Sequence, residues 1–288
     1  MTPLVAVMVI ASACLHPIWN MLLKGDEDRA ASWWLFTILL ASIGAVVCVV
    51  RGADFMSIRA VLPWMALSML GQFLYGTTLV RIYERGDLSA YYPIVRASPI
   101  GVVVLGFLFL GKTYDWVVLS GIALTVFGAF WLQKQPGRRL LDDPKTLALA
   151  VLSMLGTAFY SIGDSRAVSV VAPEIEFFWV EFLMIPMFLV SMWLTGHRRI
   201  VPRAYNLIKT RPVRHLFVGA LAYTSYALIL AAYANGGDVA AVTTMRQLSI
   251  PLSVLLGGMV LKETLIARRF GASLLLVGGI VMVIFASH

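Results

Sequence analysis

Arg96 and Arg246 lie inside stretches of sequence that are otherwise apolar. A guanidinium group stays charged at physiological pH and presents five N–H donors in a plane that matches a carboxylate or a phosphate. If these stretches cross a membrane, each guanidinium needs an anion, backbone carbonyls or water to offset its charge. The residue type and its surroundings therefore indicate binding of an anionic group away from bulk water, or else a structural ion pair.

The two arginines occupy equivalent places in an internal repeat with an offset of 150 residues. A duplicated apolar chain with a buried charge in each half is typical of secondary transporters. The repeated residues are Tyr83, Gly86, Ala90, Arg96, Val104, Lys112, Gly121 and Gly128, which recur as Tyr233, Gly236, Ala240, Arg246, Val254, Lys262, Gly271 and Gly278.

Polar residues accompany each arginine. Pro93 and Pro99 predict a helix whose hydrogen-bond ladder is loosened near Arg96, which leaves carbonyls free beside a cavity. Tyr92 shares a helical face with Arg96, so both side chains are expected to point into the bundle. The corresponding face of the second half holds Thr243, Arg246, Ser249 and Ser253.

A second polar stripe is formed by His16, Asn20 and Lys24, which are spaced one helical turn apart. Three polar groups on one stripe are hard to place against lipid, so we expect them to line the same cavity, although a lone histidine can also be a packing residue. The second half offers Asp164 and Glu181. Histidine and buried carboxylic acids exchange protons readily, so His16, Asp164 and Glu181 are candidate proton carriers.

Composition sets the class of protein. The chain has 288 residues, of which 60% are hydrophobic and 13% charged, and its mean hydropathy is +0.85. A soluble domain carries about 25% charged residues, so these values indicate an integral membrane protein. The net charge of +8 comes from short loops and does not indicate nucleic-acid binding. Cys14 and Cys48 lie in apolar segments, and neither a disulfide nor a metal site is expected.

Runs of about 20 apolar residues predict an all-α integral membrane protein with ten transmembrane helices. The first run is too long for a signal peptide, so it is expected to remain as the first span. The predicted spans are 4–23, 33–50, 60–83, 88–110, 115–133, 145–168, 175–195, 213–235, 238–261 and 267–286.

The polar stretch at 134–144 separates five spans from five. The chain therefore divides into an N-terminal five-helix repeat at 1–133, a cytoplasmic linker at 134–144 and a C-terminal five-helix repeat at 145–288. Because each repeat has an odd number of spans, the second must be inverted relative to the first. Two inverted repeats around a central cavity are expected.

Lysines and arginines are distributed unevenly between alternate loops. The loops after the first, third, fifth, seventh and ninth spans hold 17 of them and the other loops hold four. Cytoplasmic loops are the more basic ones, so both termini are predicted to be non-cytoplasmic. In this topology Arg246, Asp164 and Glu181 share the outer half of the membrane and could neutralise one another. Arg96 lies in the inner half without an acidic neighbour, so we expect it to meet a substrate carboxylate, phosphate or phosphonate.

Two further sequence motifs bear on whether the protein binds a nucleotide or is an enzyme. Residues 106–113 match the nucleotide-binding P-loop motif, but the stretch continues an apolar helix, so no nucleotide is expected. No intramembrane protease signature is present, and no enzymatic activity or catalytic residue is predicted.

The glycine pairs Gly121 with Gly128 and Gly271 with Gly278 are expected to allow close packing between the last spans of the two repeats.

Taken together, these motifs resemble the drug/metabolite transporter superfamily, in particular its EamA-like ten-helix branch. The resemblance rests on Trp19-Asn20-Met-Leu-Leu-Lys24, on the Tyr92-Pro-x-x-Arg96-x-x-Pro99 motif and on the glycine-rich spans. It implies a cavity walled by the first, third, fourth, sixth, eighth and ninth spans. The predicted substrate-binding residues are Asn20, Tyr75, Tyr92, Arg96, Tyr160, Tyr226 and Arg246, and the predicted coupling or ion-pair residues are His16, Asp164 and Glu181.

The expected function is alternating-access transport of a small polar metabolite, an amino acid or related zwitterion or anion, across a bacterial-type inner membrane. No metal or cofactor is expected, coupling to protons is one possibility, and a monomer is sufficient. One alternative is an exporter of drugs or of aromatic or cationic compounds. A more distant alternative is an accessory protein of lipid flipping or an intramembrane enzyme.

Overall fold

The computed structural model describes residues 1–24, 26, 28–85, 88–133, 143–196, 199–252 and 266–286. All regular elements in these ranges are helices, as the sequence predicts. The first half contains α1 (Pro3–Lys24), α2 (Arg29–Val50), the 3₁₀ helix η1 (Phe55–Val61), α3 (Leu62–Glu84), α4 (Leu88–Val95), α5 (Ser98–Leu110) and α6 (Trp116–Gln133). The second half contains α7 (Pro144–Ala167), α8 (Pro173–Leu194), α9 (Ile200–Thr210), α10 (Pro212–Ala234), α11 (Val239–Met245), the 3₁₀ helix η2 (Arg246–Leu248) and α13 (Ile266–Ala286).

Seven helical segments in the described part of the chain are long and apolar enough to cross a membrane, and α6 and α13 contribute shorter apolar helices. Large apolar side chains cover the outside of the bundle: Phe109 is 76% exposed, Trp116 80% and Phe285 74%. An aqueous solvent would oppose so much exposed apolar surface, whereas lipid chains accept it. These features fit a helical membrane protein.

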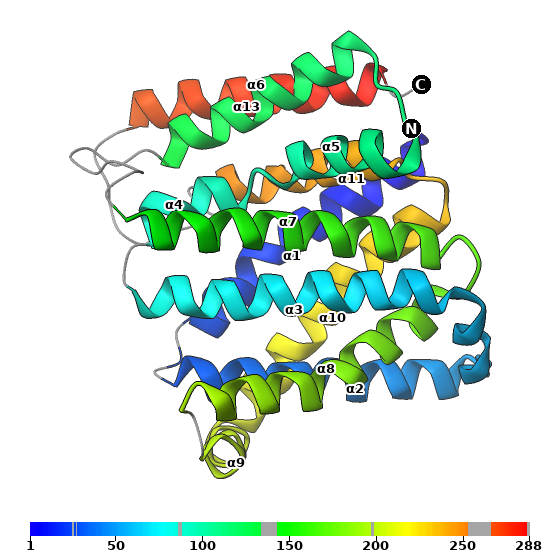
Figure 1. Ribbon diagram of the computed structural model, residues 1–288, viewed down its shortest axis with the longest axis vertical. Helices are drawn as coiled ribbons and strands as arrows, with labels where there is room; N and C mark the ends of the chain where they lie inside the picture. Colours follow the sequence, from blue (N-terminus) through cyan, green and yellow to red (C-terminus); the bar gives the residue numbers. More distant parts are fainter. Residues whose placement is uncertain are drawn as a thin grey trace.

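The helices pack in four main pairs. α1 lies along α10 and α3 along α7, whereas α2 lies along α8 and α6 along α13 (Figure 1). Each pair joins one helix of the first half of the chain to one of the second. The start of α1 and the end of α13 lie at the same end of the bundle (Figure 1). Residues 134–142, which contain most of the predicted linker, lie outside the described residues.

Two of the predicted spans are interrupted at their arginines. α4 ends at Val95, and α5 begins at Ser98 with a proline in its first turn. Proline has no N–H to donate and disfavours helical geometry in the residue before it, so Pro93 and Pro99 account for this break. In the second half α11 ends at Met245, and the tighter 3₁₀ turn of η2 begins at Arg246.

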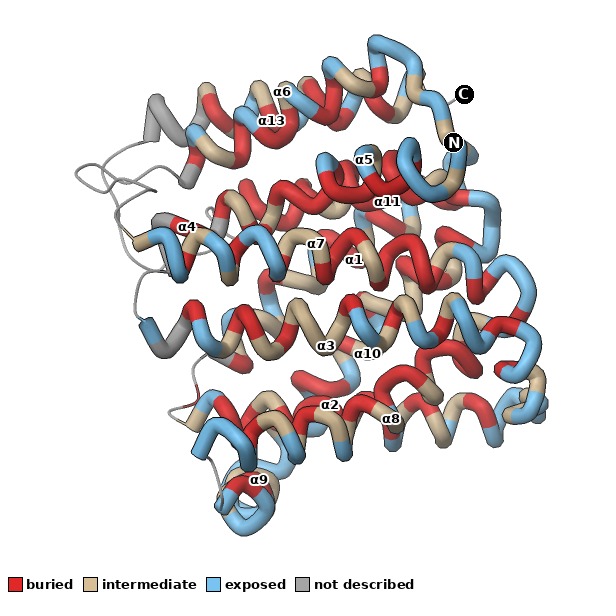
Figure 2. Tube along the Cα trace, viewed as in Figure 1, coloured by how far each residue is buried: buried red, intermediate tan, exposed pale blue. Residues whose placement is uncertain are grey.

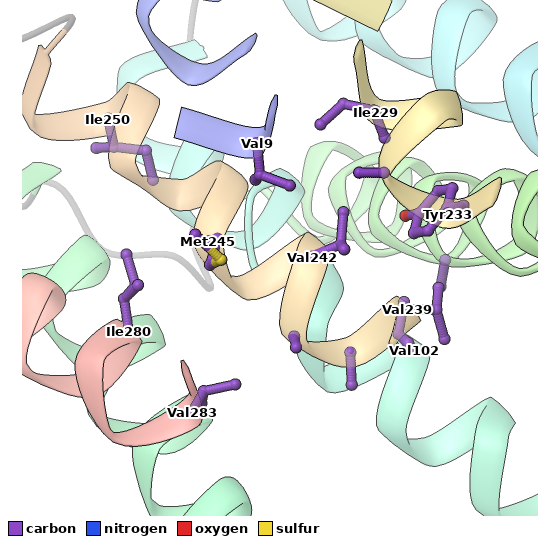
Figure 3. Close-up of a cluster of buried hydrophobic side chains, with 14 of the residues drawn as sticks. Val9, Val102, Ile229, Tyr233, Val239, Val242, Met245, Ile250, Ile280 and Val283 are labelled. Atoms are coloured by element: carbon purple, nitrogen blue, oxygen red, sulfur yellow. The ribbon is translucent and has the colours of Figure 1, made fainter. Parts of the chain in front are cut away.

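The interrupted helix α11 is held firmly on all sides. All of its residues are buried, and Figure 2 shows them in the interior of the bundle. Val242 and Met245 of α11 lie among apolar side chains from α1, α5, α10 and α13, including Val9, Ile229 and Val283 (Figure 3). This packing fixes the end of α11 at which Arg246 stands.

Glycines bring α6 and α13 together, but only partly as predicted. A Cβ atom added to Gly121 would lie 2.8 Å from the Gly279 carbonyl oxygen, and one on Gly128 would lie 2.6 Å from the Leu276 amide nitrogen. The prediction for Gly271 and Gly278 is wrong. Among the described residues, an added Cβ atom on Gly271 meets nothing within 4 Å, and one on Gly278 meets only Leu124 at 4.0 Å. Gly279, one position further, makes the close contact.

The stretch between the predicted spans 175–195 and 213–235 contains a further helix, α9. Ile200 and Ala204 of this helix are buried, whereas Val201 and Tyr205 are 50% and 65% exposed. Apolar residues at a spacing of three and four give the segment one apolar side, although it is too short and too polar to span a membrane. In Figure 1, α9 is seen end-on beyond α2 and α8.

Candidate binding cavity

A cavity of about 110 Å³ lies between the helices of the two halves. A water molecule needs roughly 10–15 Å³ of such volume, so the cavity has room for a small molecule. Its aromatic walls are formed by Trp19, Trp33, Phe36, Tyr75, Tyr160, Phe188 and Tyr226. Its polar and charged walls include Ser12, His16, Gln72, Arg96, Thr157, Glu181, Ser225, Thr243, Arg246 and Gln247.

The structure brings together seven of the ten residues singled out in the sequence. These seven line the cavity: His16, Tyr75, Arg96, Tyr160, Glu181, Tyr226 and Arg246. Asn20 does not line it, because it lies one turn beyond His16 toward the end of α1. Asp164 lies behind the wall and contacts Tyr226. The side chain of Tyr92 falls outside the described part of the chain.

Arg96 lies where α4 and α5 are separated, and its guanidinium reaches the second half of the chain. One nitrogen donates a hydrogen bond to the Ser249 hydroxyl oxygen at 2.5 Å and to the Arg246 carbonyl oxygen at 3.4 Å. The Nε–H is buried without a hydrogen-bond partner. Within the described part of the chain Arg96 forms no ion pair, so its charge is met only by neutral oxygens.

Arg246 has an aromatic environment. Its guanidinium carbon lies 5.9 Å from the ring centroids of both Tyr160 and Tyr226, a distance at which an aromatic face attracts a cation. The predicted direct ion pair with Asp164 or Glu181 is not formed between these described side chains. Tyr226 lies between the arginine and Asp164, to which it donates a hydrogen bond. The arginine and the carboxyl group therefore interact through a tyrosine.

Aromatic rings form two connected walls of the cavity. Trp19 stacks on Phe36 with centroids 5.4 Å apart, and His16 meets the Trp19 ring edge-on at 4.7 Å. On the other wall Tyr160 lies 6.1 Å from Tyr75 and 6.2 Å from Tyr226. Such rings contribute apolar contact area at fixed positions.

Several polar atoms in the walls have no partner. These are the indole N–H groups of Trp19 and Trp33, the Nε–H of Arg96 and the amide oxygen of Gln247. A buried polar atom without a hydrogen bond costs free energy, and such atoms in a native structure call for a ligand or a specific role. Three of the four are hydrogen-bond donors, and all four are buried within the wall.

Sequence reasoning missed several polar residues of this region. Gln72, Gln247 and Trp33 line the cavity, and Ser68 and Glu176 contact or neighbour Asp164 behind it. Glu176 stands in the first turn of α8, where an acidic residue is normally a solvated partner of the helix dipole. Ser68 and Gln72 are one turn apart on α3, and this spacing was the available signal for a polar stripe.

Ion pairs connect the two halves at both ends of the bundle. At one end Lys112 contacts Asp238 at 2.5 Å and Arg51 contacts Glu174 at 3.3 Å. At the other end Asp26 contacts Arg214 at 2.9 Å and Asp28 contacts Arg203 at 3.1 Å.

Lys112 follows the end of α5, and residues 106–110 of the P-loop-like motif are helical, so their amides are not presented as a phosphate-binding loop.

No group of three or more His, Cys, Asp or Glu residues suited to a metal ion occurs in the described ranges. Asp164 and Glu181 belong to a polar region that also contains hydroxyl groups and a guanidinium. The chemistry that this arrangement offers is therefore anion binding and proton exchange.

No family model and no curated protein matches the chain. A solved structure described only as "Crystal structure of protein" is similar to it, with a TM-score of 0.74 and 14% sequence identity. The similarity covers 100% of this chain and 98% of the other. At this identity the likeness establishes a shared fold over the whole chain and nothing about function.

Proposed function

We propose that the protein is a secondary-active transporter that carries a small polar metabolite with a carboxylate, an amino acid or related zwitterion, by alternating access. The observation that carries this proposal is Arg96. Arg96 lines the cavity, and among the described residues its guanidinium has two neutral oxygens as partners and an Nε–H without one. A substrate carboxylate would supply the missing counter-charge and accept the free donors.

Glu181 supports a zwitterion over a simple anion. This acidic residue lines the same cavity as the two arginines and forms no ion pair with any lysine or arginine in the described ranges. It is available to the ammonium group of an amino acid. The aromatic walls provide the apolar surface against which a side chain can pack.

The packing of the helices supports ten spans in two inverted five-helix repeats. In this assignment the first, second, third and fifth spans are α1, α2, α3 and α6. Their counterparts in the second repeat are α7, α8, α10 and α13. Under a two-fold relation the contact of α1 with α10 must be mirrored by one of α7 with α3, whereas contacts of α2 with α8 and of α6 with α13 map onto themselves. All four contacts occur. Arg96 also donates to the carbonyl of Arg246, its counterpart in the repeat.

This arrangement and the sequence motifs fit the EamA-like branch of the drug/metabolite transporter superfamily. We place the protein in a bacterial-type inner membrane with both termini non-cytoplasmic, because of the loop charges. A monomer contains both repeats and is sufficient. No cofactor is required, because the energy comes from a gradient of substrate or of protons.

A thermal-shift screen of the purified protein tests the proposal. The panel contains amino acids, the corresponding amines and carboxylic acids, choline, phosphonates and nucleosides. We expect stabilisation by one or more amino acids or related zwitterions, and counterflow of the same compound in proteoliposomes without ATP. Stabilisation by amines or choline alone, or transport that requires ATP, would contradict the proposal.

Export of aromatic or cationic compounds is the second candidate, favoured by the aromatic walls and by Glu181. The two candidate functions differ in whether they require the positive charge of Arg96. Arg96→Gln should abolish binding of a carboxylate substrate, whereas it should improve binding of a cation because it removes a like charge.

A further inference from the structure

Asp164 of α7 is fully buried behind the wall of the cavity. Its two carboxyl oxygens accept hydrogen bonds from the hydroxyl groups of Ser68 on α3 and Tyr226 on α10. Tyr226 also lines the cavity. A single hydroxyl group therefore connects the cavity with a carboxyl group that does not line it.

Glu176, in the first turn of α8, is the second fully buried acid at this place. Among the described residues, neither of its carboxyl oxygens has a partner with good hydrogen-bond geometry. The groups that act on it are Asp164, Ser68 and Glu181, which are acidic or neutral. A buried carboxylate without a counter-charge costs far more free energy than a buried carboxylic acid. A proton on Glu176 removes this cost.

The charges around the two acids do not balance without a proton. α7 contributes Asp164 and Tyr160, α8 contributes Glu176 and Glu181, and α10 contributes Tyr226. The positive charge that acts on Asp164 is that of Arg246 on η2, which lies across the Tyr226 ring. Within the described residues this guanidinium can offset one of the two charges of Asp164 and Glu176, so an ionised pair would leave net negative charge in a buried place, which is unfavourable.

We propose that Asp164 and Glu176 together hold one exchangeable proton, and that the Tyr226 hydroxyl passes this proton to and from the cavity. In the inward step the Tyr226 O–H proton moves to the Asp164 carboxylate. The Tyr226 oxygen then receives a proton from a hydronium ion in the cavity, which becomes water, or from an ammonium group, which becomes an amine. One O–H bond forms for each bond to hydrogen that breaks, and no other reactant is needed.

The site also couples proton binding to anion binding, and this step rests on the proposed function. Arg96 and Arg246 line the same cavity, so an anion bound there at Arg96 also weakens the positive charge of Arg246 that reaches Asp164. The buried pair then holds its proton more firmly, and by thermodynamic reciprocity the protonated pair favours the anion. The proton and the anionic substrate are therefore carried together.

Infrared difference spectroscopy of the purified protein after a pH jump tests the proton site without any substrate. The wild type should show the C=O band of a buried protonated carboxylic acid, and Glu176→Gln and Asp164→Asn should lose it. Glu174→Gln is the matched control, because Glu174 is two residues away on α8 but pairs with Arg51. Its spectrum should match the wild type. A band that persists in both Glu176→Gln and Asp164→Asn would overturn the proposal.

Tyr226→Phe gives a second test that does not depend on folding of the acid variants. The buried pair is kept but its hydroxyl link to the cavity is lost, so the band should respond to the pH jump much more slowly. An unchanged rate would contradict the role of Tyr226.

Titration calorimetry in two buffers of different ionisation enthalpy tests the coupling, with the zwitterion found in the thermal-shift screen. The wild type and Glu174→Gln should take up protons on binding, and the affinity of Glu176→Gln should no longer change with pH. Equal proton uptake in Glu176→Gln and the wild type would refute the coupling. If the infrared band behaves as expected but no compound binds, the transport proposal fails and the proton site stands.

Discussion

At the scale of single residues, Arg96 and Arg246 occupy equivalent places in the repeat but have different partners. Arg96 is met by a hydroxyl and a carbonyl oxygen, whereas Arg246 is met by two tyrosine rings and, through Tyr226, by Asp164. A neutral oxygen lowers the cost of a buried charge without cancelling it. Arg96 is therefore the arginine with more to gain from an anionic substrate.

Truncation of Arg96 should abolish substrate binding. Breaking a desolvated charge pair costs about 2–5 kcal/mol, so Arg96→Ala should weaken affinity by a factor of roughly 30 or more. Arg96→Lys should restore little, because a point charge does not reproduce the planar donors that contact both Ser249 and the substrate. Calorimetric titration of both variants measures the effect. Near-normal affinity in Arg96→Ala would exclude its contact with the substrate.

Arg246→Ala should act mainly on stability and proton coupling. Its removal takes away the positive charge that acts on Asp164 and leaves the acids behind Tyr226 without compensation. We expect a lower thermal unfolding temperature and altered proton uptake, with a smaller loss of affinity than in Arg96→Ala. A stable, well-folded Arg246→Ala protein that no longer binds substrate would reverse the roles of the two arginines.

At the scale of elements, α7 begins with a charged cap that lies outside the apolar bundle. The Asp143 carboxylate accepts hydrogen bonds from the Thr146 hydroxyl at 2.5 Å and from the amides of Thr146 and Lys145. These hydrogen bonds, first among them that of the Thr146 hydroxyl, and the nearby Arg85 hold the pKa of Asp143 below its ordinary value. The charged form of Asp143 therefore stabilises the start of α7.

The stabilisation by Asp143 should depend on pH in a defined direction. A lowered native pKa means that the contribution is complete above the ordinary aspartate value, about 4, and is lost as the pH falls through the native pKa. The thermal stability difference between the wild type and Asp143→Asn should be constant above about pH 5 and shrink below about pH 4. Thr146→Val, which removes the largest contribution, should show a weaker dependence. A difference that does not change down to the acid limit of folding would contradict this origin.

The glycine contacts of α6 and α13 give a second element-scale prediction. Gly121→Ala places a methyl group 2.8 Å from the Gly279 carbonyl oxygen, so the two helices must separate. Overpacking of this kind costs about 1–3 kcal/mol. Gly278→Ala, whose added methyl group is 4.0 Å from Leu124, is the matched control and should leave the unfolding temperature nearly unchanged. Equal effects in thermal unfolding would show that α6 and α13 do not pack through Gly121.

The elements also show how far the sequence could predict the fold and the cavity. Apolar runs predicted the helices, and Pro93 and Pro99 predicted the interruption at Arg96, because both signals are local. The choice between Gly278 and Gly279 depends on the rotation of α13 against α6, which no local signal contains. Glu176 looked like a solvated residue of a first turn. It is buried because its side of the first turn of α8 faces the interior of the bundle, and only the tertiary structure determines that.

At the scale of the whole molecule, ion pairs between the two halves occur at both ends of the bundle. Lys112 with Asp238 fixes the start of α11, whose other end carries Arg246. Asp26 with Arg214 fixes the start of α10, which carries Tyr226. If the protein works by the proposed alternating access, the ion pairs at the end that opens would break. Each end of the bundle would then be linked to the cavity through a helix that contributes to its wall.

The two ends of the bundle differ in their number of basic residues, and this difference predicts the orientation of the molecule in the membrane. The end with Arg203 and Arg214 contains α9 and belongs to the more basic set of loops, whereas the end with Lys112 belongs to the less basic set. The basic end should face the cytoplasm. α9 also exposes Val201 and Tyr205, and an amphipathic basic helix of this kind fits the boundary between lipid and the cytoplasm.

Labelling of single cysteines in intact cells tests this orientation. Cys14 and Cys48 are first replaced, because Cys14 is exposed. A membrane-impermeant thiol reagent should then fail to label Asn206→Cys on α9 until the cells are opened, because the basic end lies inside. Thr113→Cys, an exposed position beside Lys112 at the opposite end, should be labelled at once. Reversed labelling would instead place both termini in the cytoplasm.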